Sequence, residues 1–312
     1  MRIGIIGMGW VGSSVAISTL QDGLVRELLL CDVRPELAEG EALDLAHGAA
    51  FYPTARVAAA AVEDMADCDA VVISAGRGGH PGESRLDLLG DNAELVGGLG
   101  RRLSRLRGLA VIVTNPVDIL TRVFRDASDL PAPRVIGTGT MLDTARLREV
   151  LGRKLAFEPR SIHAQVVGEH GDSEVVLWTS AVVGGVPLRS LPGWDGASEG
   201  AIAAEVRGAA QEIIRRKGAT NHAIGLVTAA LLRWALRGER RVLTVSRVHD
   251  RVAALGGPSE IDGLALSLPT VLGMDGATDV LIPPMDASER TALERSAQAL
   301  RTACAKLTRA PR

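Results

Sequence analysis

Short runs of consecutive apolar residues alternate with longer segments of helical periodicity over the first 140 residues. The apolar runs have the length of buried strands and occupy residues 3–6, 28–31, 70–74, 109–113 and 135–136. The helical segments lie between them, at 10–20, 35–47, 86–106 and from 117 onward. Strands that are apolar on both faces and alternate with helices are typical of a parallel sheet covered on both sides. This half of the chain is therefore predicted to form a doubly wound α/β sheet.

The pattern changes beyond about residue 140. Extended segments at 162–167, 175–183, 241–246 and 263–272 are mixed with helical segments at 142–151, 201–216, 223–236 and 288–307. This mixture is typical of an α+β domain. We therefore expect two domains, residues 1–138 and residues 139–312. No Pro- or Ser-rich linker separates them, so tight packing of the two halves is expected.

Composition excludes several classes of protein. Hydrophobic residues make up 46% of the chain and the net charge is −2, values typical of a soluble globular protein. No block of like charge indicates nucleic acid or a membrane surface as a partner. The uncharged segment 3–21 resembles a signal peptide, but its four glycines favour a buried strand followed by a turn.

The three cysteines give a further indication. Cys31, Cys68 and Cys304 are far apart and form neither a CxxC pair nor a metal-ligand spacing. Free thiols of this kind favour a reducing compartment, so a cytoplasmic protein without a metal site is expected.

A glycine-rich motif follows the first predicted strand and opens the first predicted helix. Its sequence, GMGWVG at 7–12, fits GxGxxG, in which glycines allow a tight turn, close approach of a pyrophosphate and close helix–strand contact. Asp32 lies twenty residues beyond Gly12, where a carboxylate binds ribose hydroxyls and repels a 2′-phosphate. The pattern predicts a Rossmann-type, NAD-binding domain, and Arg34 is the one residue that favours NADP. The expected cofactor contacts are Gly7, Gly9, Trp10, Val11, Gly12 and Asp32.

Three separate segments carry polar residues suited to reduction of a 2-oxo acid. His170 lies in GEHGD at a predicted strand end, and its pKa range suits proton exchange with a carbonyl oxygen. Asp143 and Arg146 share one helix face; the carboxylate would orient the imidazole and the guanidinium would grip a substrate carboxylate. Arg85, just beyond the Gly- and Pro-rich loop 76–82, would polarise the ketone.

Six motifs occur in the order found in one known family. They are GMGWVGSS (7–14), PGESRLDLL (81–89), TNPVDIL (114–120), VIGTGTMLDTARLR (135–148), VGEHGDSEV (167–175) and KGAT (217–220). From end to end the chain resembles the L-lactate dehydrogenases of the lactate/malate dehydrogenase family.

The resemblance implies roles for individual residues. It implies His170 as proton donor and acceptor, Asp143 as its partner, Arg146 as carboxylate clamp and Arg85 as a loop arginine. It adds Asn115, before a typically cis Pro116, for His170 and substrate, and Thr220 for the substrate side chain. On the cofactor side it adds Ala75, Gly76, Asn115 and Thr138. It also implies L-lactate and pyruvate as substrates, a place in glycolysis, and a homotetramer.

One position departs from the family pattern. Gly79 stands where the resemblance implies glutamine in lactate enzymes or arginine in malate enzymes. A glycine supplies no charge for a second carboxylate, which counts against malate unless Arg77 or His80 substitutes. It also leaves room for larger 2-oxo acids, so an L-2-hydroxyacid dehydrogenase of the 2-hydroxyisocaproate type is the alternative. A non-catalytic dinucleotide-binding or structural protein is the alternative of another class, and the retained four polar residues argue against it.

Two further residue pairs bear on self-association and on regulation. Asp44 and His47 share a helix face that resembles the dimerisation helix of these enzymes, so a dimer or tetramer is expected. Arg148 and His163 match positions that bind an activating sugar bisphosphate in some bacterial relatives, but unregulated relatives carry the same residue types. His222 and His249 are expected to be surface or packing residues.

Overall fold

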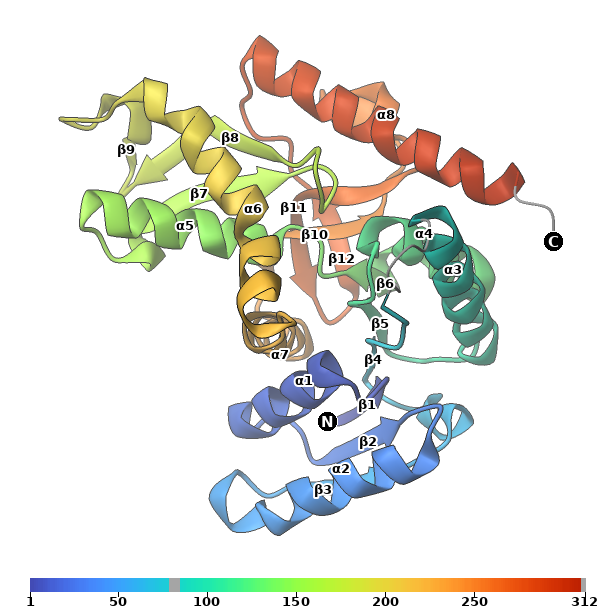
Figure 1. Ribbon diagram of the computed structural model, residues 1–312. Helices are drawn as coiled ribbons and strands as arrows, with labels where there is room; N and C mark the ends of the chain where they lie inside the picture. The colour runs from blue at the N-terminus through green and yellow to red at the C-terminus, as the bar shows by residue number, and fades with distance from the viewer. Residues whose placement is uncertain (79–84, 310–312) are drawn as a thin grey trace.

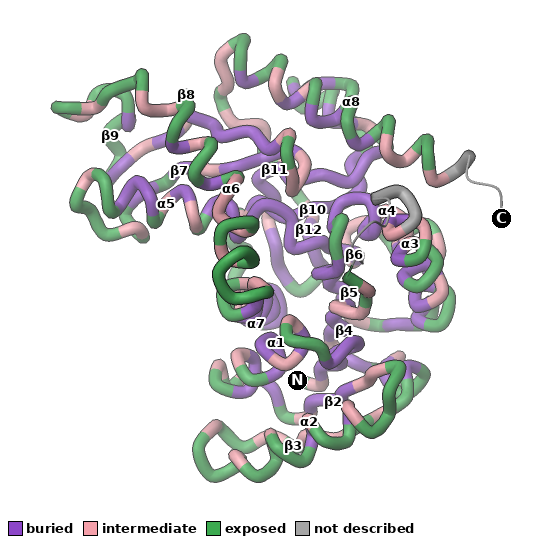
Figure 2. Tube along the Cα trace, viewed as in Figure 1, coloured by how far each residue is buried: buried purple, intermediate pink, exposed green. Residues whose placement is uncertain are grey.

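The computed structural model describes residues 1–78 and 85–309, with side chains described for 1–78 and 88–307. Within these residues the chain forms one nine-stranded sheet and one three-stranded sheet, with helices packed on both (Figure 1). Figure 2 shows that the central strands of the large sheet are buried, while the helices expose their outer faces.

The first six strands form the parallel part of the large sheet. They are β1 (Arg2–Ile6), β2 (Glu27–Cys31), β3 (Arg56–Ala59), β4 (Ala70–Ile73), β5 (Leu109–Ile112) and β6 (Val135–Gly137). Their spatial order is β3-β2-β1-β4-β5-β6, the order of a doubly wound dinucleotide-binding sheet. In such sheets ligands bind outside the carboxyl ends of the strands, at the point where the order reverses between β1 and β4.

Side chains on the two faces of these strands pack in two separate hydrophobic cores. On β1, Ile3 and Ile5 pack in the core that includes Val15 of one helix layer, while Ile6 packs in the core that includes Phe124 of the other. The first face is covered by α1 (Trp10–Asp22), α2 (Pro35–His47) and α7 (His222–Leu236). The second face is covered by α3 (Arg85–Arg102) and α4 (Val117–Ser128). Burial on both faces explains why these strands read as continuous apolar runs.

Three antiparallel strands from the second half of the chain extend the same sheet. They are β10 (Arg241–Val248), β11 (Ala265–Gly273) and β12 (Gly276–Val280). The junction is the pairing of Ser246 on β10 with Gly137 on β6. Both halves of the chain, before and after the change of sequence pattern near residue 139, therefore contribute strands to the large sheet.

The remaining elements form the upper part of Figure 1. The small sheet consists of β7 (Ile162–Val167), β8 (Val175–Val183) and β9 (Val186–Pro187). The helices α5 (Met141–Leu155) and α6 (Glu199–Lys217) pack on it through Leu147 and Ile202, and α8 (Ala287–Arg309) contacts β8 and β11 residues. No helix in the described part of the chain combines the length and apolar character needed to cross a bilayer.

The expected fold class, a doubly wound parallel sheet followed by an α+β half, is confirmed. Three local expectations differ from the structure. The helix expected to reach residue 106 ends at Arg102. Strands β3 and β12 were not expected, because the alanine-rich β3 is only partly buried at one sheet edge and β12, at the other edge, is short and carries the adjacent polar residues Thr278 and Asp279.

Candidate active site

The glycine-rich loop has the geometry that its three glycines were expected to provide. Gly7 has a φ of +97°, and a Cβ there would lie 2.4 Å from the main-chain nitrogen of Ala75. A Cβ on Gly12 would lie 1.9 Å from the carbonyl oxygen of Gly7, so the helix start packs directly on the turn. By contrast, a Cβ on Gly9 would meet no described atom within 4 Å. Gly9 thus faces open space, where a phosphate can approach the start of α1.

Asp32 lies at the end of β2, beside the glycine-rich loop. Its side chain is 9% exposed; Oδ2 accepts the main-chain N–H of Met8 at 2.7 Å and Oδ1 accepts that of Arg34 at 3.0 Å. The Arg34 side chain is largely exposed, with Nε 3.7 Å from Asp32. A cavity of about 630 Å³ is lined by Gly7, Gly9 and Asp32. The donor and acceptor set in this cavity fits a dinucleotide, with Asp32 toward a ribose and the α1 N-terminus toward the phosphates.

The other expected cofactor contacts lie at the carboxyl ends of the neighbouring strands. Ala75 and Gly76 follow β4 and line the same cavity, Asn115 follows β5, and Thr138 follows β6. The peptide between Asn115 and Pro116 is cis, as the resemblance implied. Trp10 and Val11 form the first turn of α1, with Trp10 exposed. All the expected cofactor residues therefore lie along one edge of the parallel sheet, as the fold requires.

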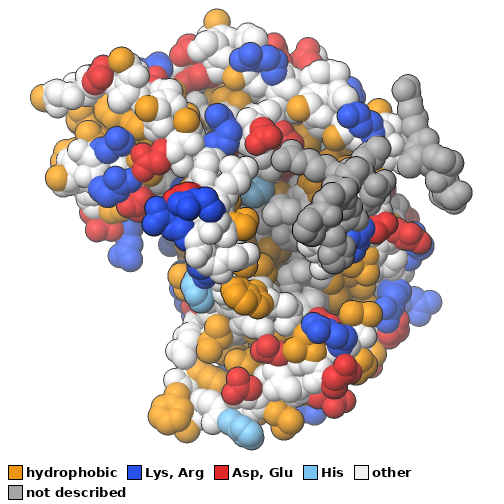
Figure 3. Space-filling view, viewed as in Figure 1, with side chains coloured by type: hydrophobic (Ala, Val, Ile, Leu, Met, Phe, Trp, Pro, Cys, Tyr) orange, Lys and Arg blue, Asp and Glu red, His pale blue; other side chains and the backbone are white. Residues whose placement is uncertain are grey.

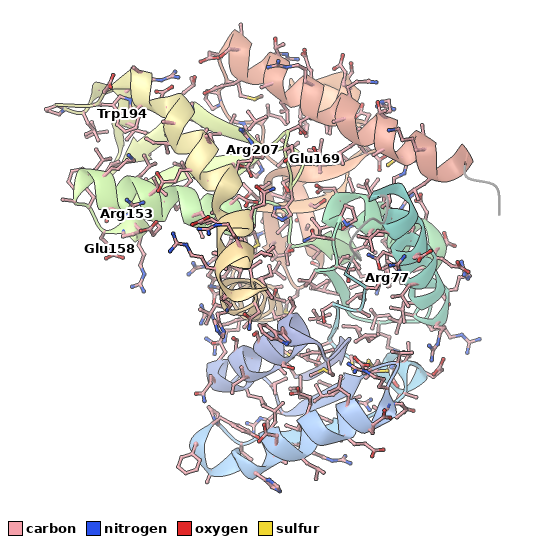
Figure 4. All side chains as sticks on the ribbon, viewed as in Figure 1. Arg77, Arg153, Glu158, Glu169, Trp194 and Arg207 are labelled. Atoms are coloured by element: carbon pink, nitrogen blue, oxygen red, sulfur yellow. The ribbon has the colours of Figure 1, made fainter. Side chains whose placement is uncertain are left out.

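Arg77 follows β4 and contacts α3. Its guanidinium forms an ion pair with Asp91, with Nε at 2.8 Å from Oδ2, and its main-chain N–H donates to Asn92 (Figure 4). Arg77 and His80 were the residues that could have supplied charge in place of Gly79, and the guanidinium of Arg77 pairs with Asp91. Gly79 itself and His80 lie outside the described residues.

His170, Asp143 and Arg146 form a connected group. The Nδ1 of His170 lies 2.6 Å from Oδ2 of Asp143, and a guanidinium nitrogen of Arg146 lies 2.8 Å from Oδ1 of the same carboxylate. Asp143 and Arg146 come from consecutive turns of α5, and His170 comes from the connection between β7 and β8. The structure thus brings together the three residues that the sequence indicated from two distant segments.

Charge interactions shift the pKa values of this group in opposite directions. Burial alone would lower the pKa of His170, but the hydrogen bond and charge of Asp143 outweigh it, so the pKa is raised above its ordinary value of 6.5. Burial alone would raise the pKa of Asp143, but His170 and then Arg146 lower it below 3.8. The arrangement favours an imidazolium facing a carboxylate, which is a proton donor held in one orientation.

The turn that carries His170 is fixed by neighbouring elements. Gly168 exchanges main-chain hydrogen bonds of 2.8 and 2.9 Å with Ser267 of β11. The main-chain N–H of Glu169 donates to Ser296 of α8 at 2.8 Å. The main-chain N–H of His170 donates to Asp118 of α4 at 2.7 Å. Together with Asp143 of α5, four elements determine where the imidazole lies, which is the rigidity that a catalytic group needs.

Asp118 is a site residue that the sequence did not reveal. It belongs to the TNPVDIL motif but is 2% exposed, and burial raises its pKa to about 6 despite the N–H of His170. The available signal was its place in the apolar sequence Val117–Leu120, because an aspartate there is buried only if something pairs with it.

Glu174 is the second buried carboxyl near His170 that was missed. It is 6% exposed, and its Oε1 has no hydrogen-bond partner among the described residues. Burial and then the charge of Asp143 raise its pKa to about 8, although Arg207 opposes the shift. Arg207, labelled in Figure 4, reaches from α6 to the main-chain oxygen of Glu174 at 3.4 Å.

The remaining residues singled out in the sequence lie outside the His170 group. Thr220 is half-buried in the connection between α6 and α7. Arg85 begins α3, but its side chain lies outside the described set. His163 is exposed on β7, and Arg148 of α5 donates its Nε–H to the carbonyl of Ala164 at 3.1 Å. His249 is fully buried, as a packing residue would be, with Nε2 2.9 Å from the carbonyl of Leu266.

Comparison with known proteins assigns both halves of the chain. Residues 1–137 match the family model of the lactate/malate dehydrogenase NAD binding domain, and residues 140–310 match that of the lactate/malate dehydrogenase alpha/beta C-terminal domain. The chain belongs to the lactate/malate dehydrogenase family. Its first half is therefore an NAD-binding domain, and the protein is an NAD-dependent dehydrogenase.

Individual relatives in this family cover nearly the whole chain. An L-lactate dehydrogenase of Synechococcus sp. (strain JA-3-3Ab) is 42% identical over 96% of this chain and 97% of its own length. One of Thermus aquaticus is 40% identical over 98% of this chain and 99% of its own. The crystal structure of a minor L-lactate dehydrogenase from Enterococcus mundtii superposes with a TM-score of 0.93 at 35% identity, covering 97% of both chains. The resemblance seen in the motifs thus extends to the complete family fold.

Proposed function

We propose that this protein is an L-lactate dehydrogenase that interconverts pyruvate and L-lactate. The observation that carries the proposal is the group of His170, Asp143 and Arg146, joined by contacts of 2.6 and 2.8 Å. In this NAD-dependent dehydrogenase the group supplies a proton donor, His170, and a guanidinium that can bind a carboxylate, Arg146. The similarity of the chain to L-lactate dehydrogenases along its full length supports the same substrate pair.

In the reductive direction the reaction consumes a 2-oxo acid, NADH and one proton. Bound NADH supplies the hydride that reduces the carbonyl carbon. His170, held as an imidazolium by Asp143, donates its proton to the carbonyl oxygen as negative charge develops there. The resulting neutral imidazole takes up a proton from solvent before the next turnover, and in the oxidative direction it accepts the hydroxyl proton.

The other residues bind and orient the substrate. Arg146 would pair with the substrate carboxylate through a two-pronged hydrogen bond that lysine cannot reproduce. Its contact with Asp143 at 2.8 Å already fixes the guanidinium beside the imidazole. We assign Arg85 to polarisation of the carbonyl, Asn115 to support of His170 and the substrate, and Thr220 with Gly79 to the pocket for the substrate side chain.

A substrate panel tests the proposal. Initial rates of NADH oxidation are measured with pyruvate, oxaloacetate and 2-oxoisocaproate at equal concentrations. The highest kcat/KM is expected with pyruvate. Dominance of oxaloacetate would contradict the role given to Gly79, and absence of turnover with every 2-oxo acid would contradict the proposal as a whole.

Self-association is the second part of the proposal. Exposed apolar side chains lie at Leu43 on α2, at Phe51, which is 84% exposed, and at Leu226 on α7. Leu226 and Trp234 also line a groove of about 350 Å³ between α5, α7 and β10. In Figure 3 hydrophobic side chains of the lower part of the molecule are open to solvent on this face. We assign these surfaces to contacts between copies of the chain in a dimer or tetramer, which sedimentation of the wild type and of Leu226→Asp tests.

The proposed location is the cytoplasm. Cys31, Cys68 and Cys304 form no disulfide in the described structure, and burial raises the pKa of each thiol. Thiols of this kind suit a reducing compartment.

A further inference from the structure

A buried amide joins the helix that follows the glycine-rich loop to the segment that carries Thr220. Asn221 is 9% exposed, and its Nδ2 donates to the Oγ of Ser14 on α1 at 2.8 Å. Ser14 is itself 8% exposed, so water competes little for this hydrogen bond. The two residues are 207 positions apart in sequence, and their contact therefore depends on the tertiary fold.

The Asn221 side chain bonds to distant Ser14 and does not cap its own helix, α7. Asn221 is the N-cap residue of α7, a position at which asparagine normally accepts an N–H of the first helical turn, yet its side chain makes no capping bond. Its Oδ1 instead accepts a hydrogen bond from Nζ of Lys217, the last residue of α6, at 2.8 Å. The side chain thus closes the short connection 218–221 from one end to the other, with Thr220 inside it.

The backbones of α1 and α7 are also packed unusually closely at this point. A Cβ on Gly225 would lie 2.7 Å from the main-chain oxygen of Ser14, so only glycine permits the approach. Next to Ser14, Ser13 binds Glu41 of α2 at 2.9 Å and contacts the carbonyl oxygen of Met8 in the glycine-rich loop at 3.3 Å. A rigid path therefore runs from that loop through α1 to the Thr220 connection.

We propose that Asn221 is a positioning residue that fixes the Thr220 segment relative to the cofactor-binding helix, so that substrate affinity depends on the Ser14–Asn221 hydrogen bond. The inference rests on the proposed function, because it takes Thr220 as part of the substrate pocket. Asn221 acts through Thr220 and α1, and does not touch the reacting atoms. Its loss should loosen substrate binding while leaving the proton transfer from His170 intact.

The test is a double-mutant cycle on kinetic constants. Asn221→Ala, Ser14→Ala and the double variant are compared with wild type for pyruvate KM, kcat and NADH dissociation constant. Each single variant should raise the pyruvate KM roughly three- to tenfold, the effect of one or two hydrogen bonds, with kcat within about twofold of wild type. The double variant should resemble the Asn221→Ala single variant, because both remove the same contact.

Two further variants separate positioning from general destabilisation. Thr228→Val removes a buried hydroxyl from α7 that bonds within its own helix, to Ile224, and should leave the pyruvate KM unchanged. Asn221→Asp keeps an acceptor for Lys217, and the Ser14 hydroxyl can turn to donate to it, so KM should return close to the wild-type value. If Asn221→Ala fails to fold, Ser14→Ala removes the same hydrogen bond from the other side.

The inference is overturned if the two alanine variants are additive, if neither changes KM, or if Thr228→Val raises KM as much as Asn221→Ala. This failure differs from failure of the proposed function. In the latter case the wild-type protein would not turn over any 2-oxo acid, and the NADH dissociation constants of Ser14→Ala and Asn221→Ala would still report on the link to the cofactor helix.

Discussion

The main-chain N–H of His170 donates to the buried carboxylate of Asp118 at 2.7 Å. An acid from α4 therefore holds the backbone of the turn that presents the imidazole, while Asp143 of α5 contacts the ring itself, with Nδ1 of His170 2.6 Å from Oδ2. His170 is thus fixed at both its backbone and its ring.

Replacing Asp118 should weaken both stability and activity. Asp118→Ala leaves the buried N–H of His170 unpaired, which costs about 1–3 kcal/mol of unfolding free energy. Asp118→Asn keeps an oxygen acceptor and should lose less. Thermal unfolding and pyruvate reduction by both variants check this order. Equal stability of wild type and Asp118→Ala would mean that the hydrogen bond does not hold the turn.

The His170–Asp143 pair predicts the pH dependence of pyruvate reduction. The reaction needs the imidazolium, and Asp143 raises the pKa of His170 above 6.5. The kcat/KM for reduction should therefore be highest at low pH and fall with a midpoint above 6.5. In Asp143→Asn the charge is lost, so the midpoint should move to lower pH, with a lower plateau. A midpoint that stays in place after this substitution would show that Asp143 does not set the pKa of His170.

Glu174 predicts a pH dependence of stability. Its pKa is raised to about 8 in the folded protein from an ordinary 4.5, so its contribution to stability is complete below 4.5 and is lost as the pH rises through 8. Glu174→Gln does not titrate. Its advantage over wild type should grow between pH 5 and pH 8, to at most about 3 kcal/mol near pH 7.

Melting temperatures across this pH range measure that difference. The matched control is Glu158→Gln, at an exposed glutamate labelled in Figure 4, which should show no such trend. A constant difference between Glu174→Gln and wild type at all pH values would contradict the placement of the Glu174 carboxyl in a poorly hydrated site.

The parts of this protein that sequence predicts are those that local chemistry determines. Gly7 and Gly12 leave no room for a Cβ, Gly9 between them faces open space, and Asp32 ends the next strand, so the cofactor loop could be predicted from the sequence. His170, Asp143 and Arg146 were recognisable by residue type and motif. The contact of His170 with Asp143, however, follows only from the packing of α5 against the β7–β8 connection.

The parts that sequence does not predict depend on distant packing. The burial of Asp118 and Glu174 depends on residues from elsewhere in the chain: Asp118 accepts the main-chain N–H of His170, and Arg207 of α6 reaches the main-chain oxygen of Glu174. The joining of β10 to β6 through Ser246 and Gly137 has no local signal either. Of these features, Asp118 holds the catalytic turn directly, through the main-chain N–H of His170.

The most direct test of the central claim is the turnover of His170→Asn measured together with its affinity for NADH. Pyruvate reduction should fall by roughly 10²–10⁴-fold, because the proton donor is lost. The NADH dissociation constant should stay within about twofold of wild type, because the cofactor cavity around Gly9 and Asp32 is untouched. Wild-type turnover in this variant would show that His170 does not exchange the proton.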